Sequence, residues 1–160
     1  MKFAVYTMVL TDSEIHFDCC RLPWLEGESN KTHLKEYLFV AIDDYSRELF
    51  AAILPDKSSH SATRFLHQVI DECAYTIECA YSDNGKEFKG NPNDHPFMQL
   101  CMQGNIHQAI TKIKTPKTNG KAERVIRTLK EQWHSTEVFA NRNQRRISLI
   151  RFLNCLNFEC

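Results

Sequence analysis

YLFVAIDDYSRELFAAIL, residues 37–54, is the stretch that decides the fold. It holds two apolar runs, 37–44 and 48–54, separated only by Tyr45, Ser46 and Arg47. Nearly continuous apolar runs of this length are typical of central β-strands, and so short a connection predicts that the two strands are antiparallel. Upstream, EIHFDCCRL (14–22) alternates apolar and polar residues, which predicts a third strand in the same meander.

The rest of the chain continues as alternating helices and strands. The apolar spacing predicts, in order, a helix at 58–73, a strand at 76–82, a short helix at 96–103, a strand at 105–113, a basic loop at 114–121, a helix from 122, and a helix at 143–157. In the last helix we expect Ile147, Ile150, Leu153 and Leu156 to face inward and the arginines outward. The prediction is an α/β fold with a five-stranded mixed sheet flanked by helices.

The composition indicates one ordinary globular domain, because 42% of its 160 residues are hydrophobic and 25% are charged. The formal net charge is zero, but the charges are unevenly distributed. Residues 1–110 carry 9 Lys/Arg against 16 Asp/Glu, a net of −7, whereas residues 111–160 carry 11 against 4, a net of +7. This basic C-terminal third can provide a phosphate-binding face or can simply be a solvated helix face.

The seven cysteines predict reduced thiols rather than disulfides or zinc ligands. Their number is odd, Cys19 and Cys20 are adjacent, and no C-x-x-C pair occurs. No apolar stretch is long enough to span a membrane, and the opening MKFAVYTMVL lacks a small-residue cleavage site. We therefore expect a cytoplasmic protein without a membrane partner.

Three acidic residues lie where this topology would bring them together. Asp18 is midway along the first strand, Asp83 follows the fourth strand, and Glu123 is in the first turns of the helix from 122. A helical crossover makes the fourth strand a parallel neighbour of the first. Carboxylates are the ligands that Mg²⁺ prefers, and two such ions about 3.5–4 Å apart can promote phosphoryl transfer. The spacing therefore favours a metal-dependent phosphoryl-transfer site.

Each of these acids also has a purely structural interpretation. Asp18 can be a polar residue on a half-buried strand, and Glu123 a first-turn acid favoured by the helix dipole. Asp43 and Asp44 are rival acids, but they close a strand before a turn, where Asp commonly accepts backbone hydrogen bonds. The histidines show no ligand spacing and are expected to be surface or half-buried residues, among them His16, His95, His107 and His134.

Four motifs in order carry a resemblance to a known family. IHFD (15–18), YLFVAIDDYSR (37–47), YSDNGKEF (81–88) and TPKTNGKAERVIRTLKEQWH (115–134) resemble the integrase core of bacterial insertion-sequence DDE transposases and, more distantly, of retroviral integrases. The resemblance implies a ribonuclease-H-like fold. It also implies that Asp18, Asp83 and Glu123 are the catalytic residues and the ligands of Mg²⁺ or Mn²⁺, with two ions in the site.

The same resemblance implies DNA as the partner, both as transposon ends and as target. Basic and polar residues near the third acid are then expected to bind DNA, namely Lys117, Asn119, Lys121, Arg124, Arg127 and Lys130. Two element ends must be held together, so the family implies a homodimer or higher oligomer. The implied location is the bacterial cytoplasm, in association with the nucleoid.

The chain also departs from the family pattern. The interval from Asp83 to Glu123 is longer than usual, with the extra residues at 89–96. We divide the chain into an N-terminal extension (1–13), the catalytic core (14–140) and a C-terminal helix (141–160) that we expect to be truncated. The family's N-terminal helix-turn-helix, which reads the ends of the element, is expected to have no counterpart in these residues.

Three functions follow from these observations. The first is a DDE transposase or integrase core that cleaves DNA and transfers the 3′-hydroxyl to a target strand. The second is a truncated, catalytically silent remnant that only binds DNA or dimerises. The third is a ribonuclease-H-type nuclease, which the residues of the four motifs disfavour.

Overall fold

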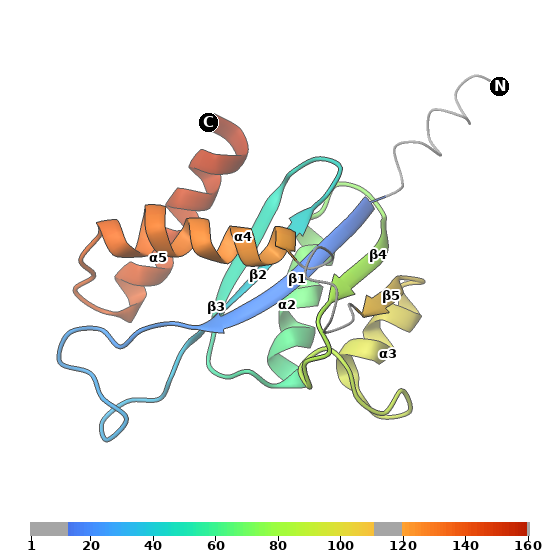
Figure 1. Ribbon diagram of the computed structural model, residues 1–160, viewed down its shortest axis with the longest axis horizontal. Helices are drawn as coiled ribbons and strands as arrows, with labels where there is room; N and C mark the ends of the chain where they lie inside the picture. Colours follow the sequence, from blue (N-terminus) through green and yellow to red (C-terminus); the bar gives the residue numbers. More distant parts are fainter. Residues whose placement is uncertain (1–12, 111–119, 160) are drawn as a thin grey trace.

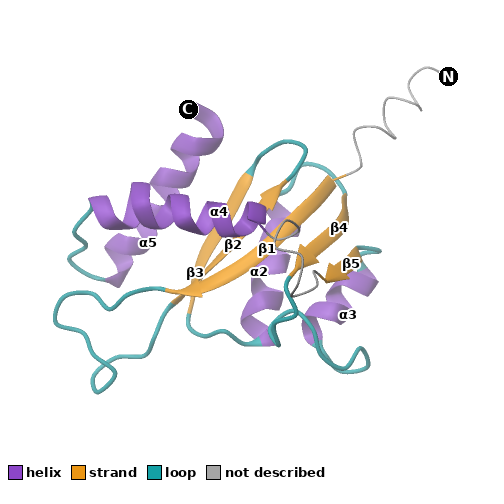
Figure 2. Cartoon of the chain, in the orientation of Figure 1, coloured by secondary structure: helices purple, strands orange, loops and turns teal. Residues whose placement is uncertain are grey.

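The chain forms a twisted five-stranded sheet with helices on both faces (Figures 1 and 2). The computed structural model describes residues 13–110 and 120–159. The strands are β1 (Ser13–Arg21), β2 (Tyr37–Asp43), β3 (Leu49–Leu54), β4 (Ile77–Ser82) and β5 (His107–Ile110). The α-helices are α2 (Ser59–Glu72), α3 (Pro96–Gln103), α4 (Gly120–Thr128) and α5 (Arg142–Asn154).

The strand order is β3-β2-β1-β4-β5. The first three strands are paired antiparallel, as the short turns predicted, and β4 and β5 extend the sheet in parallel beyond β1. Helix α2 makes the crossover from β3 at one edge to β4 on the far side of β1. The predicted order of elements and the mixed sheet are therefore confirmed.

Some element boundaries differ from those expected. β5 begins at His107 rather than at 105, while residues 111–113 of the predicted strand lie outside the described residues. Helix α4 already includes Gly120, before the predicted start at Ala122. Helix α4 also does not stay α-helical: at Leu129 it becomes a π-helical turn that ends at Trp133, followed by a 3₁₀ turn over His134–Thr136. The wider turn places Leu129 and Trp133 in the core, where both are buried.

Two apolar cores lie on opposite faces of the sheet. On one face, Ile15 and Phe17 of β1 pack with Phe65 of α2 and Phe97 of α3. On the other face, strand residues such as Val40 pack with the apolar sides of α4 and α5. Successive residues of a strand point to opposite faces, so Ile15 and Phe17 enter the first core while Glu14, His16 and Asp18 face the side of α4.

Helix α5 is rotated relative to the sequence expectation. Ile147 and Ile150 were expected inward but are 42% and 58% exposed, so that prediction is wrong. Leu153 is buried as expected, but Leu149 and Arg145 are buried in place of the two isoleucines, and only 1% of Arg145 is exposed. A buried guanidinium cannot be inferred from apolar spacing, and its ion pair selects the face that α5 turns to the sheet.

The Arg145 guanidinium is buried against the loop between β1 and β2, which supplies hydrogen-bond partners for both of its terminal nitrogens. It donates to the Glu36 carboxylate at 2.9 Å and to the Pro23 carbonyl at 2.9 Å. Arg146 pairs with the second oxygen of the same buried Glu36, and Arg142 donates to Glu28 at 2.8 Å. Three arginines of α5 therefore bind two acids of one loop.

Two further findings concern the described part of the chain. Its six cysteines, Cys19, Cys20, Cys73, Cys79, Cys101 and Cys155, are free thiols. None of its helices is both long enough and apolar enough to cross a membrane.

The Arg145→Ala variant is expected to lower the free energy of unfolding by about 3 kcal/mol, because it leaves a buried carboxylate short of a partner. Urea unfolding followed by circular dichroism measures this loss. The control is Arg151→Ala, an exposed position on the same helix, which should change stability by less than about 0.5 kcal/mol. Equal effects of the two substitutions would contradict the role assigned to Arg145.

Candidate active site

The parallel pairing of β1 and β4 places two aspartates side by side. His16 on β1 lies opposite Tyr81 on β4, and their rings stack with centroids 4.8 Å apart. Two residues beyond this pair lie Asp18, which is still within β1, and Asp83, which directly follows the end of β4. The register therefore brings both carboxylates to the same level of the sheet.

The pKa of the Asp18 carboxyl departs clearly from its ordinary value. This pKa is raised from 3.8 to about 6, chiefly by burial and in addition by the charges of Asp83 and Glu123, while a hydrogen bond from the Cys19 amide opposes the shift. That bond, from the Cys19 nitrogen to Asp18 Oδ1, is 2.8 Å long. Asp83 and Glu123 therefore lie close enough to Asp18 for their charges to act on it.

Glu123 comes to the site from α4, which crosses the sheet over β1 and β2 (Figure 1). Ala122, Val125 and Ile126 are buried against the strands. Glu123 lies beside this apolar face, in the first turn of the helix, and is itself exposed. The burial of its neighbours thus fixes the direction from which the third carboxylate approaches.

A fourth carboxylate, Glu87, supports the turn after Asp83. It is buried, its Oε1 accepts from Cys19 Sγ at 3.5 Å, and Lys57 Nζ lies 3.7 Å from the same oxygen. Asp83 Oδ1 accepts from the Gly85 amide at 2.9 Å. A Cβ at Gly85 would lie 2.5 Å from Glu87 Oε1, so a larger residue there would force the Glu87 carboxylate to shift.

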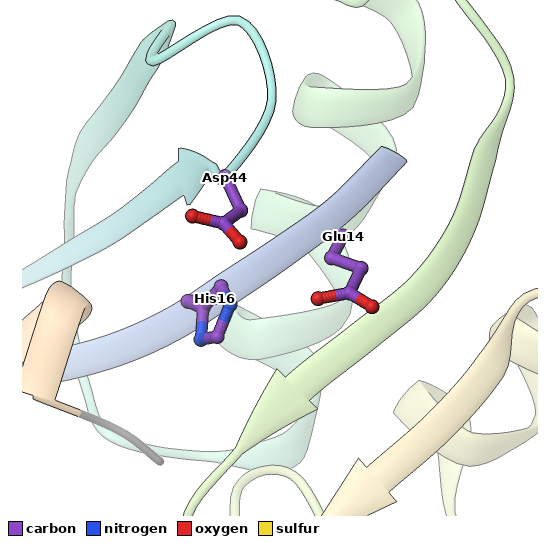
Figure 3. Close-up of side chains that lie close together, drawn as sticks. All are labelled: Glu14, His16 and Asp44. Atoms are coloured by element: carbon purple, nitrogen blue, oxygen red, sulfur yellow. The ribbon is translucent and has the colours of Figure 1, made fainter. Parts of the chain in front are cut away.

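A second group of potential ligands lies further back along β1. Figure 3 shows Glu14 and His16 on β1 with Asp44 from the end of β2, and one potential ligand atom of each lies within 4.8 Å of those of the other two. Among the described residues this is the one group of three that is so compact; Asp18, Asp83 and Glu123 are more widely spread. Lys121 of α4 forms an ion pair with Asp44, which keeps the pKa of Asp44 low.

The expected DNA-binding residues divide into three sets. Lys117 and Asn119 lie outside the described residues. Arg124, Arg127 and Lys130 are exposed on α4 and the turn that follows it. Lys121 is half-buried and engaged with Asp44.

With the site described, comparison with known proteins identifies the family. The family model described as the integrase core domain matches residues 14–116, well over half of the chain. The chain belongs to the integrase core domain family. The matched region includes Asp18 and Asp83 and ends before Glu123.

Two curated relatives of this integrase core come from mobile elements. One is a transposon-derived protein of Caenorhabditis elegans, 35% identical over 97 residues, which are 59% of this chain and 31% of the relative. The other is the retrovirus-related Pol polyprotein from transposon TNT 1-94 of Nicotiana tabacum, 31% identical over 102 residues, or 62% of this chain and 7% of the relative. The chain therefore covers less than a third of the length of either.

Solved structures of retroviral integrases share the fold. The catalytic core domain of BIV integrase superposes with a TM-score of 0.64 at 22% identity, over 92% of this chain and 84% of that one. The simian T-cell lymphotropic virus intasome, solved in complex with PP2A regulatory subunit B56 gamma, gives a TM-score of 0.71 at 17% identity, over 92% and 49%. The ribonuclease-H-like fold expected from the sequence is confirmed.

Sequence reasoning missed two parts of this site. Glu87 lies within the YSDNGKEF motif without a role in the site assigned from the sequence, whereas its burial beside Cys19 and its ion pair with Lys57 make it part of the charged centre. His16 was expected to be a surface or half-buried residue, whereas it is buried beside Glu14 and Asp44. The alternation of β1 already placed Glu14, His16 and Asp18 on one face, and that signal was available.

The interpretation of Asp43 as a turn residue is confirmed. Its Oδ2 accepts from the Ser46 amide at 2.8 Å, and its carbonyl accepts from the Arg47 amide at 2.9 Å. Asp43 is fully buried.

The pKa of Asp18 predicts how stability depends on pH in metal-free buffer. Because its folded-state pKa of about 6 exceeds the ordinary value of 3.8, the stabilising contribution is present below about pH 4 and is lost as the pH rises through 6. Asp18→Asn should therefore be more stable than the parent at pH 7.5, by about 1 kcal/mol after allowance for solvent screening.

Thermal unfolding in EDTA at pH 5 and pH 7.5 measures this effect. The advantage of the Asp18→Asn variant should grow from the lower to the higher pH, to roughly 2–4 °C in Tm. Glu26→Gln, at an exposed acid of the β1–β2 loop, is the control and should show no such growth. An Asp18→Asn protein no more stable than the parent at pH 7.5 would refute the raised pKa of Asp18.

Proposed function

We propose that this integrase core catalyses metal-dependent cleavage of DNA strands and transfer of a 3′-hydroxyl end to target DNA. The observation that carries the proposal is the electrostatic coupling of Asp18 to both Asp83 and Glu123. Three carboxylates around a half-buried position repel one another, and a divalent cation relieves that repulsion. An oxygen donor set of this kind suits Mg²⁺ or Mn²⁺.

Asp18, Asp83 and Glu123 would hold the metal. When bound, two such ions supply activation of the attacking water or 3′-hydroxyl and stabilisation of the leaving oxygen in an in-line displacement. The protein's own contribution is to hold the three carboxylates on rigid elements. Asp18 lies within a central strand, and the turn that carries Asp83 is braced by the buried Glu87.

The basic residues of α4 would bind the DNA backbone beside the carboxylates. Arg127 follows Glu123 by one helical turn, so the two side chains lie on the same flank of the helix. Burial raises the pKa of the Cys20 thiol, and the charge of Lys130 opposes this, so Lys130 lies near β1. A strand bound at the carboxylates would pass both cations, and Lys117 and Asn119 would add contacts from the preceding segment.

The assembly we propose contains at least two copies of the chain, since two element ends must be joined to one target. The simian viral neighbour was solved as an intasome, which supports an oligomeric assembly for this family member as well. The cellular site we propose is the cytoplasm, where the chain would act on DNA.

Nicking of supercoiled plasmid by the purified chain in Mg²⁺ or Mn²⁺ tests the proposed activity. Asp18→Asn, Asp83→Asn and Glu123→Gln should each reduce the nicking rate by at least about 100-fold, because each removes an oxygen ligand of the metal. Glu14→Gln is the matched control: it lies on the same strand and face as Asp18 but outside the proposed triad, and should stay within about threefold of the parent.

The outcomes separate the alternatives. A parent chain that binds DNA but shows no metal-dependent nicking would favour a catalytically silent remnant. Faster cleavage of an RNA–DNA hybrid than of duplex DNA would favour a ribonuclease-H-type nuclease. Loss of nicking in Glu14→Gln but not in Asp18→Asn would assign the metal to the group in Figure 3.

A further inference from the structure

A cation-lined pocket lies between the β2–β3 turn and helix α4. Its volume is about 200 Å³. The turn and its flanking strands contribute Ile42, Arg47 and Leu49, and the helix contributes Lys121, Arg124, Val125 and Thr128. The lining thus contains three cationic side chains, one hydroxyl and no acidic residue.

The positive charge of this pocket is only partly compensated. Asp44, just outside the lining, pairs with Lys121. Among the described residues, no carboxylate oxygen lies within 4.0 Å of a side-chain nitrogen of Arg47 or Arg124. One acid against three cations leaves a net positive pocket, and such a pocket attracts an anion.

Arg47 occupies a backbone conformation that does not suit an arginine. Its φ is +65°, in the left-handed region, where a residue with a Cβ costs about 1–2 kcal/mol more than glycine. The turn is nevertheless well fixed, because the Arg47 amide donates to the Asp43 carbonyl at 2.9 Å and the Asp43 amide donates to Glu48 at 3.0 Å. The fold would be served better by glycine, so the guanidinium is the feature that arginine adds at this position.

The pocket and the carboxylates flank the same helix. Lys121, Arg124 and Thr128 follow one another at spacings of three and four residues and so share one flank of α4. Glu123 and Arg127, four residues apart, share a different flank. A polyanion that crosses α4 beside Glu123 therefore meets the pocket on the other side of the helix.

We propose that the pocket formed by Arg47, Lys121 and Arg124 binds a backbone phosphate of DNA, and that Arg47 is a DNA-contacting residue. The guanidinium groups provide planar donors suited to phosphate oxygens, and the Thr128 hydroxyl adds a further donor. The inference rests on the proposed function in one respect, that the polyanion is DNA. It adds a contact from the β2–β3 turn, a part of the chain remote from α4 in sequence.

The test compares Arg47→Gln with the parent in binding to duplex DNA, measured by fluorescence anisotropy in EDTA across 50–200 mM salt. Loss of one phosphate contact should weaken binding on every DNA sequence and make the slope of log K against log salt shallower by about 1. Arg64→Gln is the matched control. Arg64 is an exposed arginine of α2, on the opposite face of the sheet, and its replacement should leave the slope unchanged.

A second variant distinguishes the loss of the Arg47 charge from a loss of stability. Arg47→Gly removes the cation and also the cost of the left-handed conformation, so it should lose the same DNA affinity as Arg47→Gln without a fall in Tm. An Arg47→Gln protein that keeps the parent's slope would overturn the inference, as would a parent that binds no DNA in this salt range. Metal-dependent nicking by the same preparations reports separately on the carboxylates, so that the pocket can fail while the proposed reaction stands.

Discussion

The parallel pairing of β1 with β4 is the constraint on which the rest of the site depends. The two strands are far apart in sequence and are joined by the α2 crossover, yet their register sets Asp18 and Asp83 at one level. The stacked rings of His16 and Tyr81 lie one strand repeat before them. A shift of one residue would turn Asp18 into the apolar core and remove it from its partner. Register, more than any single contact, therefore makes two distant acids into one centre.

Other carboxylates lie near this pair, and two of them form ion pairs with lysines. Glu87 is buried beside Cys19 and faces the ammonium of Lys57, and Asp44 faces that of Lys121. Asp18 has no such cation within salt-bridge distance among the described residues, and burial together with the neighbouring carboxylates raises its pKa. The carboxylates that surround Asp18 are thus the ones left for a divalent ion to neutralise, which is why we propose a metal-dependent activity for this integrase core.

The sequence predicted most of the fold because apolar periodicity reports directly on burial. The three antiparallel strands, the α2 crossover and the helix that follows the basic loop were all predicted in this way. The orientation of α5 was not, since it depends on the buried Arg145 and its pairing with Glu36, more than 100 residues earlier. Apolar periodicity does not reveal a charged residue that is buried because it pairs with a residue far away in the sequence. The π-helical turn at Leu129 was not predicted for a similar reason, because tertiary packing of Trp133 selects it.

The candidate triad could be located from motifs, whereas its surroundings required coordinates. The role of Glu87, the compact group of Glu14, His16 and Asp44, and the placement of Arg47 beside α4 all depend on which strands are neighbours. Anomalous diffraction from crystals of the chain with Mn²⁺ and a short DNA duplex tests the central claim most directly. We predict a Mn²⁺ peak between Asp18 and Asp83, within coordination distance of both. A peak at Glu14, His16 and Asp44 with none at Asp18 would contradict the assignment.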